Sequence, residues 1–323
     1  SGLLTIDKGS PILGKKRAET FHSIVAKLIY VGTRARTDIL LSLAFLCGRV
    51  REPTEQDEKK LRRLLEYLRG TKDLALRLGA DSLNKFMTWV DASFAIHPDM
   101  RSHTGGVISF GRGGIMCKSR KQRLNCKSST EAELIGASDY LPHTLYVKMF
   151  MEAQGYPIDT TIFYQDNESA IKMERNGKAS CGQRSRHIDI RYFFITDHCK
   201  RRNIDIVHCP TEDMLADYFT KPLQGSLFRK FRSVLLGHAH ISSLNHHSPT
   251  TANEERVESG NPEGNPEEDP VRQPEYRTHY GGTLSTAMAT HSGSCAVRAV
   301  RFADNDNHSI KLSSHSIQKS PEN

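Results

Sequence analysis

Apolar residues at helical spacing dominate the first quarter of the chain. Mainly apolar runs at residues 21–36 and 38–50 predict two helices that need a surface to pack against. A third helix is predicted by four leucines at i, i+3, i+4 and i+7, namely Leu61, Leu64, Leu65 and Leu68. Thr54 and Asp57 have capping-box spacing at its start, and Gly70 supplies its end. We therefore expect a small helical module.

From residue 85 onward the apolar pattern shortens to runs typical of strands. Residues 85–95, 105–112 and 113–120 are separated by turn residues such as Gly113 and Gly114, which predicts a three-stranded antiparallel meander. The change of period from helical to alternating marks the start of a second structural region.

Helices and strands alternate after the meander. A long helix is expected over 131–154, opened by Ser128-Ser129-Thr130 and kinked at Pro142. The later expected elements are strands at 160–166 and 204–210, and helices at 168–176, 187–202, 212–221 and 224–236. A hairpin series followed by this alternation predicts an α/β fold, with a mixed sheet covered by helices.

Composition divides the chain into a folded part and a tail. Beyond residue 238 it shifts to Ser, Thr, Asn, Pro, Gly, His and Glu without an apolar period, which predicts disorder. The expected segments are a flexible N-terminus at 1–19, the helical module at 20–80, one α/β domain at 84–237 and a disordered tail at 238–323.

The net charge of +8 divides at nearly the same place. Residues 1–235 carry +12, from 38 Lys and Arg against 26 Asp and Glu, and residues 236–323 carry −4, from 7 against 11. A basic compact region suits a polyanionic partner such as nucleic acid. A solvated, salt-bridged surface accounts for the same charge equally well.

Cysteine usage and hydropathy indicate the compartment. The seven cysteines are odd in number and never form a CxxC pair, so neither a disulfide framework nor a zinc site is indicated, and a reduced, intracellular protein is expected. No run approaches the roughly 18 apolar residues of a membrane helix, and no signal-peptide pattern occurs, so no membrane partner is expected. A start without Met suits a fragment or processed product.

Four separated carboxylates are the candidate chemistry. Strands rarely contain Asp, yet Asp91 lies inside the first run of the meander, where burying its charge is costly. Glu133 lies in the first turns of the long helix, Asp166 at the end of the fourth strand and Asp217 in a late helix. A shared divalent cation would offset the repulsion, and oxygen-only ligands select Mg²⁺ or Mn²⁺.

Each carboxylate also has a structural interpretation. Both Glu131 and Glu133 have capping-box spacing from a Ser or Thr, and helical phase does not choose between them. An Asp-Asn pair after a strand, as at Asp166, is common in turns, and Asp217 alone would be an exposed helix charge.

Seven segments in order carry a resemblance to a known family. They are WVDASFA, RSHTGG, CKSRKQ, SSTEAEL, YQDNESAI, RHIDIRYFF and VHCPTEDMLADYFTKPLQG. In order and spacing they resemble the ribonuclease H domain of copia-type retrotransposon Pol polyproteins, and the helical module resembles the segment between polymerase and ribonuclease H. The resemblance covers roughly residues 20–237.

The resemblance implies a five-stranded ribonuclease H-like mixed sheet flanked by helices, and an endonuclease that cleaves the RNA strand of RNA–DNA hybrids. It implies two divalent ions, Mg²⁺ or Mn²⁺, with Asp91 bridging both, Glu133 and Asp166 holding one and Asp217 completing the other. It favours Glu133 over Glu131, because the family's catalytic Glu directly precedes an apolar residue. His208, in the loop before the last carboxylate, would assist product release or proton transfer, or be an ordinary surface histidine.

Two groups of basic residues are candidates for binding the phosphates of the hybrid. A strand-to-loop run and the start of a helix would contact phosphates without reading sequence. These residues are Lys118, Arg120, Lys121 and Arg123 in the run, and Arg186 and Arg191 at the helix start.

Other interpretations stay open at this stage. No Tyr-x-Asp-Asp polymerase motif occurs, so the resemblance makes an upstream polymerase region of the same polyprotein a partner, in a cytoplasmic particle or the nucleus. One alternative is a truncated, catalytically silent retrotransposon fragment that folds and binds nucleic acid. The tail favours this alternative, because it lies beyond the end of the resemblance. A transposase or integrase on the same fold would place its Glu last, whereas here it is second.

Overall fold

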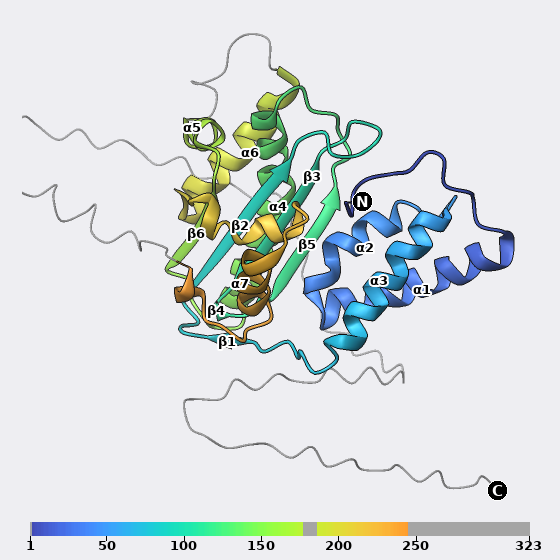
Figure 1. The fold of residues 1–323 in the computed structure, drawn as a ribbon. Coiled ribbons are helices and arrows are strands. Elements are labelled where there is room, and N and C mark those ends of the chain that lie inside the picture. Colours follow the sequence, from blue (N-terminus) through green and yellow to red (C-terminus); the bar gives the residue numbers. More distant parts are fainter. Residues whose placement is uncertain (1, 177–185, 245–323) are drawn as a thin grey trace, which may run out of the picture. The chain divides into compact units, whose positions relative to one another are not determined.

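A computed structural model describes residues 2–176 and 186–244, without the side chains of 176 and 186–193. The described residues all belong to one compact unit. It begins with three helices, α1 (Lys15–Arg34), α2 (Leu40–Cys47) and α3 (Glu55–Gly70), with a 3₁₀ turn η1 (Thr37–Ile39) between the first two (Figure 1). Helix α1 begins at Lys15, so the prediction of a flexible segment through residue 19 was wrong at its end.

The helical module packs around apolar residues that include Leu61 and Leu64 of the predicted spacing, whereas Leu65 is exposed. Phe21 and Val25 of α1 meet Leu46 of α2 and Leu61 and Leu64 of α3 in one buried cluster. The predicted capping box is confirmed, because the side chain of Thr54 accepts from the Asp57 N–H and that of Asp57 accepts from the Thr54 N–H.

The central sheet has five strands in the order β5-β3-β2-β6-β7. The strands are β2 (Lys85–Ser93), β3 (His103–Ser109), β5 (Met116–Lys121), β6 (Thr160–Gln165) and β7 (Ile204–His208). Strands β2, β3 and β5 are antiparallel, as the meander predicted, and β6 and β7 add in parallel beside β2. The short strands β1 (Gly79–Ala80) and β4 (Gly111–Arg112) form a separate pair.

Both faces of the sheet are covered, because alternate residues of β2 point to opposite sides. Phe86 and Val90 pack in the cluster formed with α4 (Ser129–Ala153), α5 (Glu168–Asn176) and α6 (Arg186–Arg202). Trp89 packs in a second cluster with α7 (Gly225–Leu235) and the turn η4 (Leu215–Phe219). In Figure 1, α7 and α4 accordingly lie on opposite faces.

The structure corrects two boundaries near the C-terminal end of the sheet region. The helix expected over 212–221 is instead two 3₁₀ turns, η3 (Thr211–Asp213) and η4, which are separated by the non-helical residue Met214. The prediction of disorder from residue 238 was wrong at its start, because η5 (Ile241–Ser243) is formed and Ile241 and Leu244 are buried in the second cluster. Residues 245–323 lie outside the described residues.

The helical module is packed onto the sheet region. Leu40 of α2 joins the second cluster, and the ring of Tyr67 from α3 lies edge-on to Phe228 of α7 at 6.2 Å. Within the described ranges, no helix is long and apolar enough to serve as a membrane span.

Candidate metal centre

Two neighbouring parallel strands bring Asp91 and Asp166 to the same end of the sheet. The register pairs Trp89 with Tyr164, so Asp91 and Asp166, each two residues further along, come level where the strands finish. Asp91 is the seventh residue of β2 and is 1% exposed, whereas Asp166 directly follows β6 and is half-buried. The carboxyl ends of adjacent parallel strands are a common place for ligand sites.

Helix α4 supplies the third carboxylate, and its first turn decides between the two glutamates. Ser128 caps the helix by accepting from the Glu131 N–H at 3.2 Å, and Glu131 accepts from the Lys127 N–H at 2.7 Å. Glu133 instead reaches the sheet, where its Oε2 accepts from the Ala92 N–H at 3.0 Å. The structure therefore assigns capping to Glu131 and the carboxylate cluster to Glu133.

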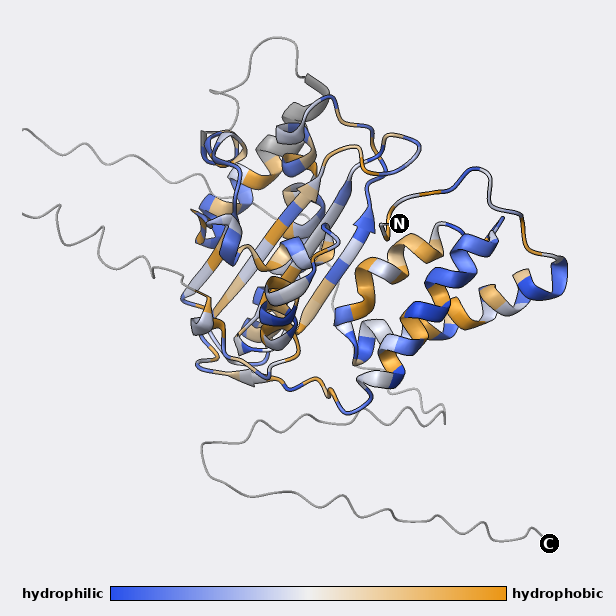
Figure 2. Cartoon of the chain, in the orientation of Figure 1, coloured by the Kyte–Doolittle hydropathy of each residue, from blue (hydrophilic) through white to orange (hydrophobic). Residues whose placement is uncertain are grey.

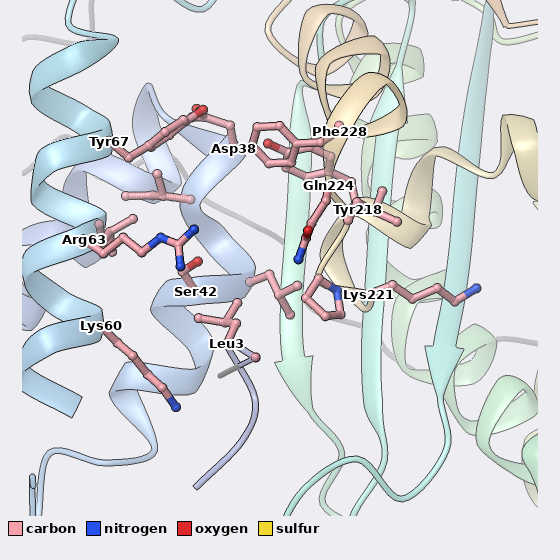
Figure 3. A pocket seen from close by; sticks show the side chains of 17 residues that line it. Leu3, Asp38, Ser42, Lys60, Arg63, Tyr67, Tyr218, Lys221, Gln224 and Phe228 are labelled. Atoms are coloured by element: carbon pink, nitrogen blue, oxygen red, sulfur yellow. The ribbon is translucent and has the colours of Figure 1, made fainter. Parts of the chain in front are cut away.

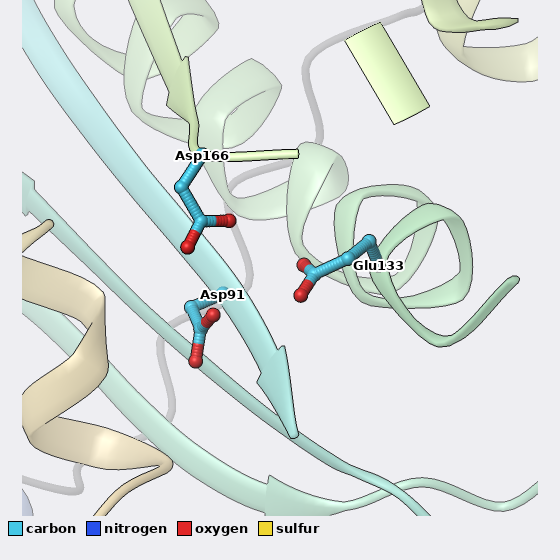
Figure 4. A group of neighbouring side chains, drawn as sticks. All are labelled: Asp91, Glu133 and Asp166. Carbon is cyan, nitrogen blue, oxygen red and sulfur yellow. The ribbon is translucent and has the colours of Figure 1, made fainter. Parts of the chain in front are cut away.

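Asp91, Glu133 and Asp166 converge on one point. One oxygen from each lies within 4.8 Å of the others, a spacing that fits a shared metal ion. Figure 4 shows the three carboxylates turned toward one another from β2, α4 and the end of β6. They line an open cleft to which Phe94 and Ile96 also contribute.

Asp217 reaches the same site from the opposite face of the sheet. It lies in turn η4 and is 2% exposed. The ammonium of Lys221, one helical turn later, lies 2.7 Å from its Oδ1 and 3.6 Å from Oδ1 of Asp91. The structure thus places Asp217 beside the three-carboxylate group, with a lysine between it and Asp91.

Two residues of the same segment, Thr220 and Lys221, were missed by sequence reasoning. The hydroxyl of Thr220 donates to Oδ2 of Asp91, and the ammonium of Lys221 lies near Oδ1 of the same carboxylate. Both lie inside the motif that carries Asp217, at i+3 and i+4 from it. That spacing was the available signal, because residues three and four apart share one side of a helical turn.

Gly105 allows the Asp217 segment to lie so close to the sheet. It pairs directly with Asp91 across β3 and β2. A Cβ at Gly105 would come within 2.7 Å of Phe219 Cβ, 2.8 Å of Thr220 Cγ2 and 2.9 Å of the Ala216 carbonyl oxygen. Only a glycine leaves room for this backbone approach.

Burial and the repulsion of neighbouring carboxylates raise the pKa values of Glu133, Asp166 and Asp217. Desolvation first, and then the charges of Asp91 and Asp166, raise the pKa of Glu133 well above its ordinary value. Desolvation and Asp91 also raise the pKa of Asp166, and they raise that of Asp217 to about 7. Burial alone would lower the pKa of Lys221, but Asp91 and Asp217 raise it overall. The group as a whole therefore favours additional positive charge.

His208 lies near the site but not where it was expected. It is the exposed last residue of β7 rather than part of a loop, and it pairs in register with Gln165, next to Asp166. Its positive form contributes to lowering the pKa of Asp166, although burial and Asp91 outweigh this effect.

The expected basic run lies along an edge strand. Lys118 and Arg120 are exposed on β5, and Arg123 is exposed just beyond it, whereas Lys121 pairs with Asp99 at 2.6 Å. Figure 2 shows this end of β5 as hydrophilic. Arg186 opens α6 and Arg191 follows within it, but the side chains of both lie outside the described residues.

A second cleft separates α3 from the segment that carries Lys221 (Figure 3). Lys60, Arg63 and Tyr67 line one side, and Gln224 and Phe228 line the other. Lys221 lines both this cleft and the one at the carboxylates, and Figure 3 shows its side chain extending away from α3. The two clefts are thus adjacent at this lysine.

Comparison with known proteins identifies the relatives of the chain. No family model matches it. It is 28% identical over 221 residues to the retrovirus-related Pol polyprotein from transposon TNT 1-94 of Nicotiana tabacum, covering 68% of this chain and 16% of the relative. It is 30% identical over 215 residues to that from transposon RE1 of Arabidopsis thaliana, covering 66% of this chain and 14% of the relative. Its homologues are the Pol polyproteins of copia-type transposons.

The chain spans only a small part of these Pol polyproteins, 16% and 14% of their lengths. Among solved structures, ribonuclease H1 from the archaeon Halobacterium salinarum NRC-1 matches 42% of this chain and 93% of its own, at 13% identity and a TM-score of 0.29. The expected α/β architecture, a five-stranded mixed sheet with flanking helices, is confirmed by the strand order and the helices on both faces.

Proposed function

We propose that this chain is a metal-dependent ribonuclease H-type endonuclease of a copia-like retrotransposon, which cleaves the RNA strand of RNA–DNA hybrids. The observation that carries the proposal is the convergence of Asp91, Glu133 and Asp166 within 4.8 Å, with Asp217 beside them. The Pol homologues support the same activity, because the resemblance places these four acids in the family's order.

The donor set fits hard divalent cations. The three carboxylates of the cluster supply oxygen ligands, and the cluster contains no cysteine or histidine. The raised pKa values of Glu133 and Asp166 reflect an excess of negative charge that a cation would offset. We propose Mg²⁺ or Mn²⁺, with Asp91, Glu133 and Asp166 holding one ion and Asp91 and Asp217 a second. When bound, such ions acidify the attacking water and stabilise the leaving 3′ oxygen.

A backbone N–H and a hydroxyl beside the carboxylates orient them for this role. The Ala92 N–H fixes Glu133, and the Thr220 hydroxyl fixes Asp91, so neither carboxylate has to reorganise when ligands arrive. His208 is proposed to move protons or assist product release from the exposed end of β7, near Asp166. Products would carry 5′-phosphate and 3′-hydroxyl ends.

The hybrid is proposed to lie across the open cleft and along β5. Lys118, Arg120 and Arg123 are exposed there and can contact phosphates, and Lys121 can do so in exchange for its ion pair with Asp99. Arg186 and Arg191 are proposed to contribute from α6. The helical module is proposed to be a connection segment leading from an upstream polymerase region of the same polyprotein, which would be the chain's protein partner inside the cell.

The test is hydrolysis of a labelled RNA–DNA hybrid by the full chain. The full chain is needed because Leu40, Ile241 and Leu244 all belong to the core beneath the site. Cleavage should require Mg²⁺ or Mn²⁺, and Asp166→Asn should lower it by roughly a hundredfold to a thousandfold. Circular dichroism should show an unchanged fold, because Asp166 is half-buried at a strand end.

A matched control lies two residues from the catalytic glutamate. Glu131→Gln makes the same chemical change as Glu133→Gln on the same turn of α4, but it touches the helix cap. Cleavage should survive Glu131→Gln and be lost with Glu133→Gln. A folded wild-type chain that binds the hybrid without cutting it would instead identify a catalytically silent element fragment.

A further inference from the structure

One lysine forms ion pairs with two of the four carboxylates. Lys221 Nζ lies 2.7 Å from Asp217 Oδ1 and 3.6 Å from Asp91 Oδ1, and the two aspartate side chains are only 3% and 2% exposed. The ammonium therefore lies between the two residues to which the proposed function gives the second metal ion. A cation that binds there must compete with Lys221 for the same oxygens.

The other half of the site is different. Among the described side chains, neither Glu133 nor Asp166 forms an ion pair with a lysine, arginine or histidine. The backbone N–H of Ala92 contacts only Oε2 of Glu133. A cation that binds between Asp91, Glu133 and Asp166 thus breaks no ion pair of Glu133 or Asp166 and meets Lys221 only through its longer, 3.6 Å contact with Asp91.

We propose that Lys221 makes the two metal positions unequal, so that the free protein takes up one divalent ion readily and a second only when Lys221 leaves Asp91 and Asp217. This inference rests on the proposed function for the location of the metal positions. It makes Lys221 a positioning residue that sets the order of ion binding, with Asp91 shared between the lysine and the first ion.

The surroundings of Lys221 give it room to move. Its side chain is 38% exposed, and it lines both the carboxylate cleft and the adjacent cleft beside α3. A flexible ammonium at the mouth of the cleft can exchange its carboxylate partners for a phosphate oxygen of the substrate. Arrival of the hybrid would then release Asp91 and Asp217 for the second ion.

The test is equilibrium titration of the full chain with Mn²⁺ alone, without nucleic acid, with bound ions counted by electron paramagnetic resonance and heats measured by calorimetry. The wild-type chain should bind one ion tightly and a second much more weakly. Lys221→Met should strengthen binding of the second ion by about tenfold, because a competing charge is removed from a half-buried pair, and should change binding of the first ion much less. Lys221→Arg should behave like the wild-type chain.

Lys230 provides a matched control. It is 33% exposed and pairs with the buried Asp213 at 2.9 Å, so Lys230→Met removes a similar ion pair away from the cluster and should leave both Mn²⁺ affinities unchanged. An unchanged second affinity in Lys221→Met would overturn the proposal, as would an equal gain for both ions. If Lys221→Met does not fold by circular dichroism, Lys221→Gln carries the same measurement.

The proposal and the proposed function fail separately. A chain that binds Mn²⁺ as expected but never cleaves a hybrid loses only the nuclease activity. A chain that cleaves, but whose Mn²⁺ binding ignores Lys221→Met, loses only the role of the lysine.

Discussion

The helical module and the sheet both bury carboxylates, but they differ in whether those carboxylates are paired with cationic side chains. In the module, Asp38 is paired with Arg36 at 2.8 Å and accepts from the Tyr67 hydroxyl at 2.6 Å, and Asp57 is paired with Arg49 at 3.1 Å. In the sheet, Asp91, Glu133 and Asp166 are gathered, and among the side chains that the structure describes a single lysine, Lys221, forms an ion pair with this group. Buried acids that stabilise a fold come with their own cations, whereas acids gathered without them indicate a site for an external one.

The largest effect should come from breaking a paired acid. Asp38→Ala leaves the buried Arg36 without its carboxylate and should lower the free energy of unfolding by about 3 kcal/mol or more. Urea denaturation of the full chain measures this change. Asp99→Ala, which removes a 45%-exposed acid from Lys121, should cost at most about 1 kcal/mol. Equal losses in the two variants would remove the contrast between buried and exposed pairs.

A smaller effect should follow from moving the segment that carries Asp217 away from the sheet at Gly105. Gly105→Ala forces a methyl group against Phe219, Thr220 and the Ala216 carbonyl, and such overpacking costs about 1–3 kcal/mol. The rate of cleavage should fall by more than the loss of folded protein explains, because the shift moves Asp217 and Lys221 away from Asp91. Gly70→Ala, where a Cβ meets nothing within 4 Å, is the control for denaturation and hybrid cleavage. Full cleavage by a destabilised Gly105→Ala would mean that Asp217 is not needed.

The smallest effect is the pH dependence of the buried acids at the site, and its sign is opposite to that of acids whose pKa a nearby cation lowers. Asp217 has a pKa of about 7 in the folded chain against an ordinary 3.8, and the pKa of Glu133 is also raised. Between these values the unfolded chain releases protons that the folded chain keeps, so the metal-free protein should become less stable as pH rises from about 4 to 7. Cleavage should rise over the same range, because the carboxylates must ionise to hold the ions.

Thermal unfolding at several pH values, with a chelator and with Mn²⁺, checks this dependence. Glu133→Gln should flatten the slope and stabilise the metal-free chain at pH 8 by on the order of 1 kcal/mol, whereas Glu131→Gln should keep the slope. Added Mn²⁺ should restore the wild-type stability at pH 8. Stability that rises with pH in the metal-free chain would show that the carboxylates are already neutralised.

Sequence patterns predicted the elements well where local chemistry decides them. The α3 helix follows from its leucine spacing and from the Thr54–Asp57 capping box, and the β2–β3–β5 meander follows from short runs between turn residues. The prediction was wrong at residues 212–221, where a helical pattern became two 3₁₀ turns because the chain must lay Leu215 and Phe219 onto the sheet while turning Asp217 toward Asp91. Packing against distant residues overrode the local preference there.

The sequence by itself determined which acids are unusual. An aspartate inside an apolar strand, together with the order of a known motif, was enough to name Asp91, to imply Asp166 and Asp217, and to favour Glu133 over Glu131. Only the tertiary structure decided that Glu131 caps while Glu133 enters the cluster, and that Thr220 and Lys221 contact Asp91. The physical reason is that both decisions depend on distances between residues more than forty positions apart, which sheet register and the close approach at Gly105 establish.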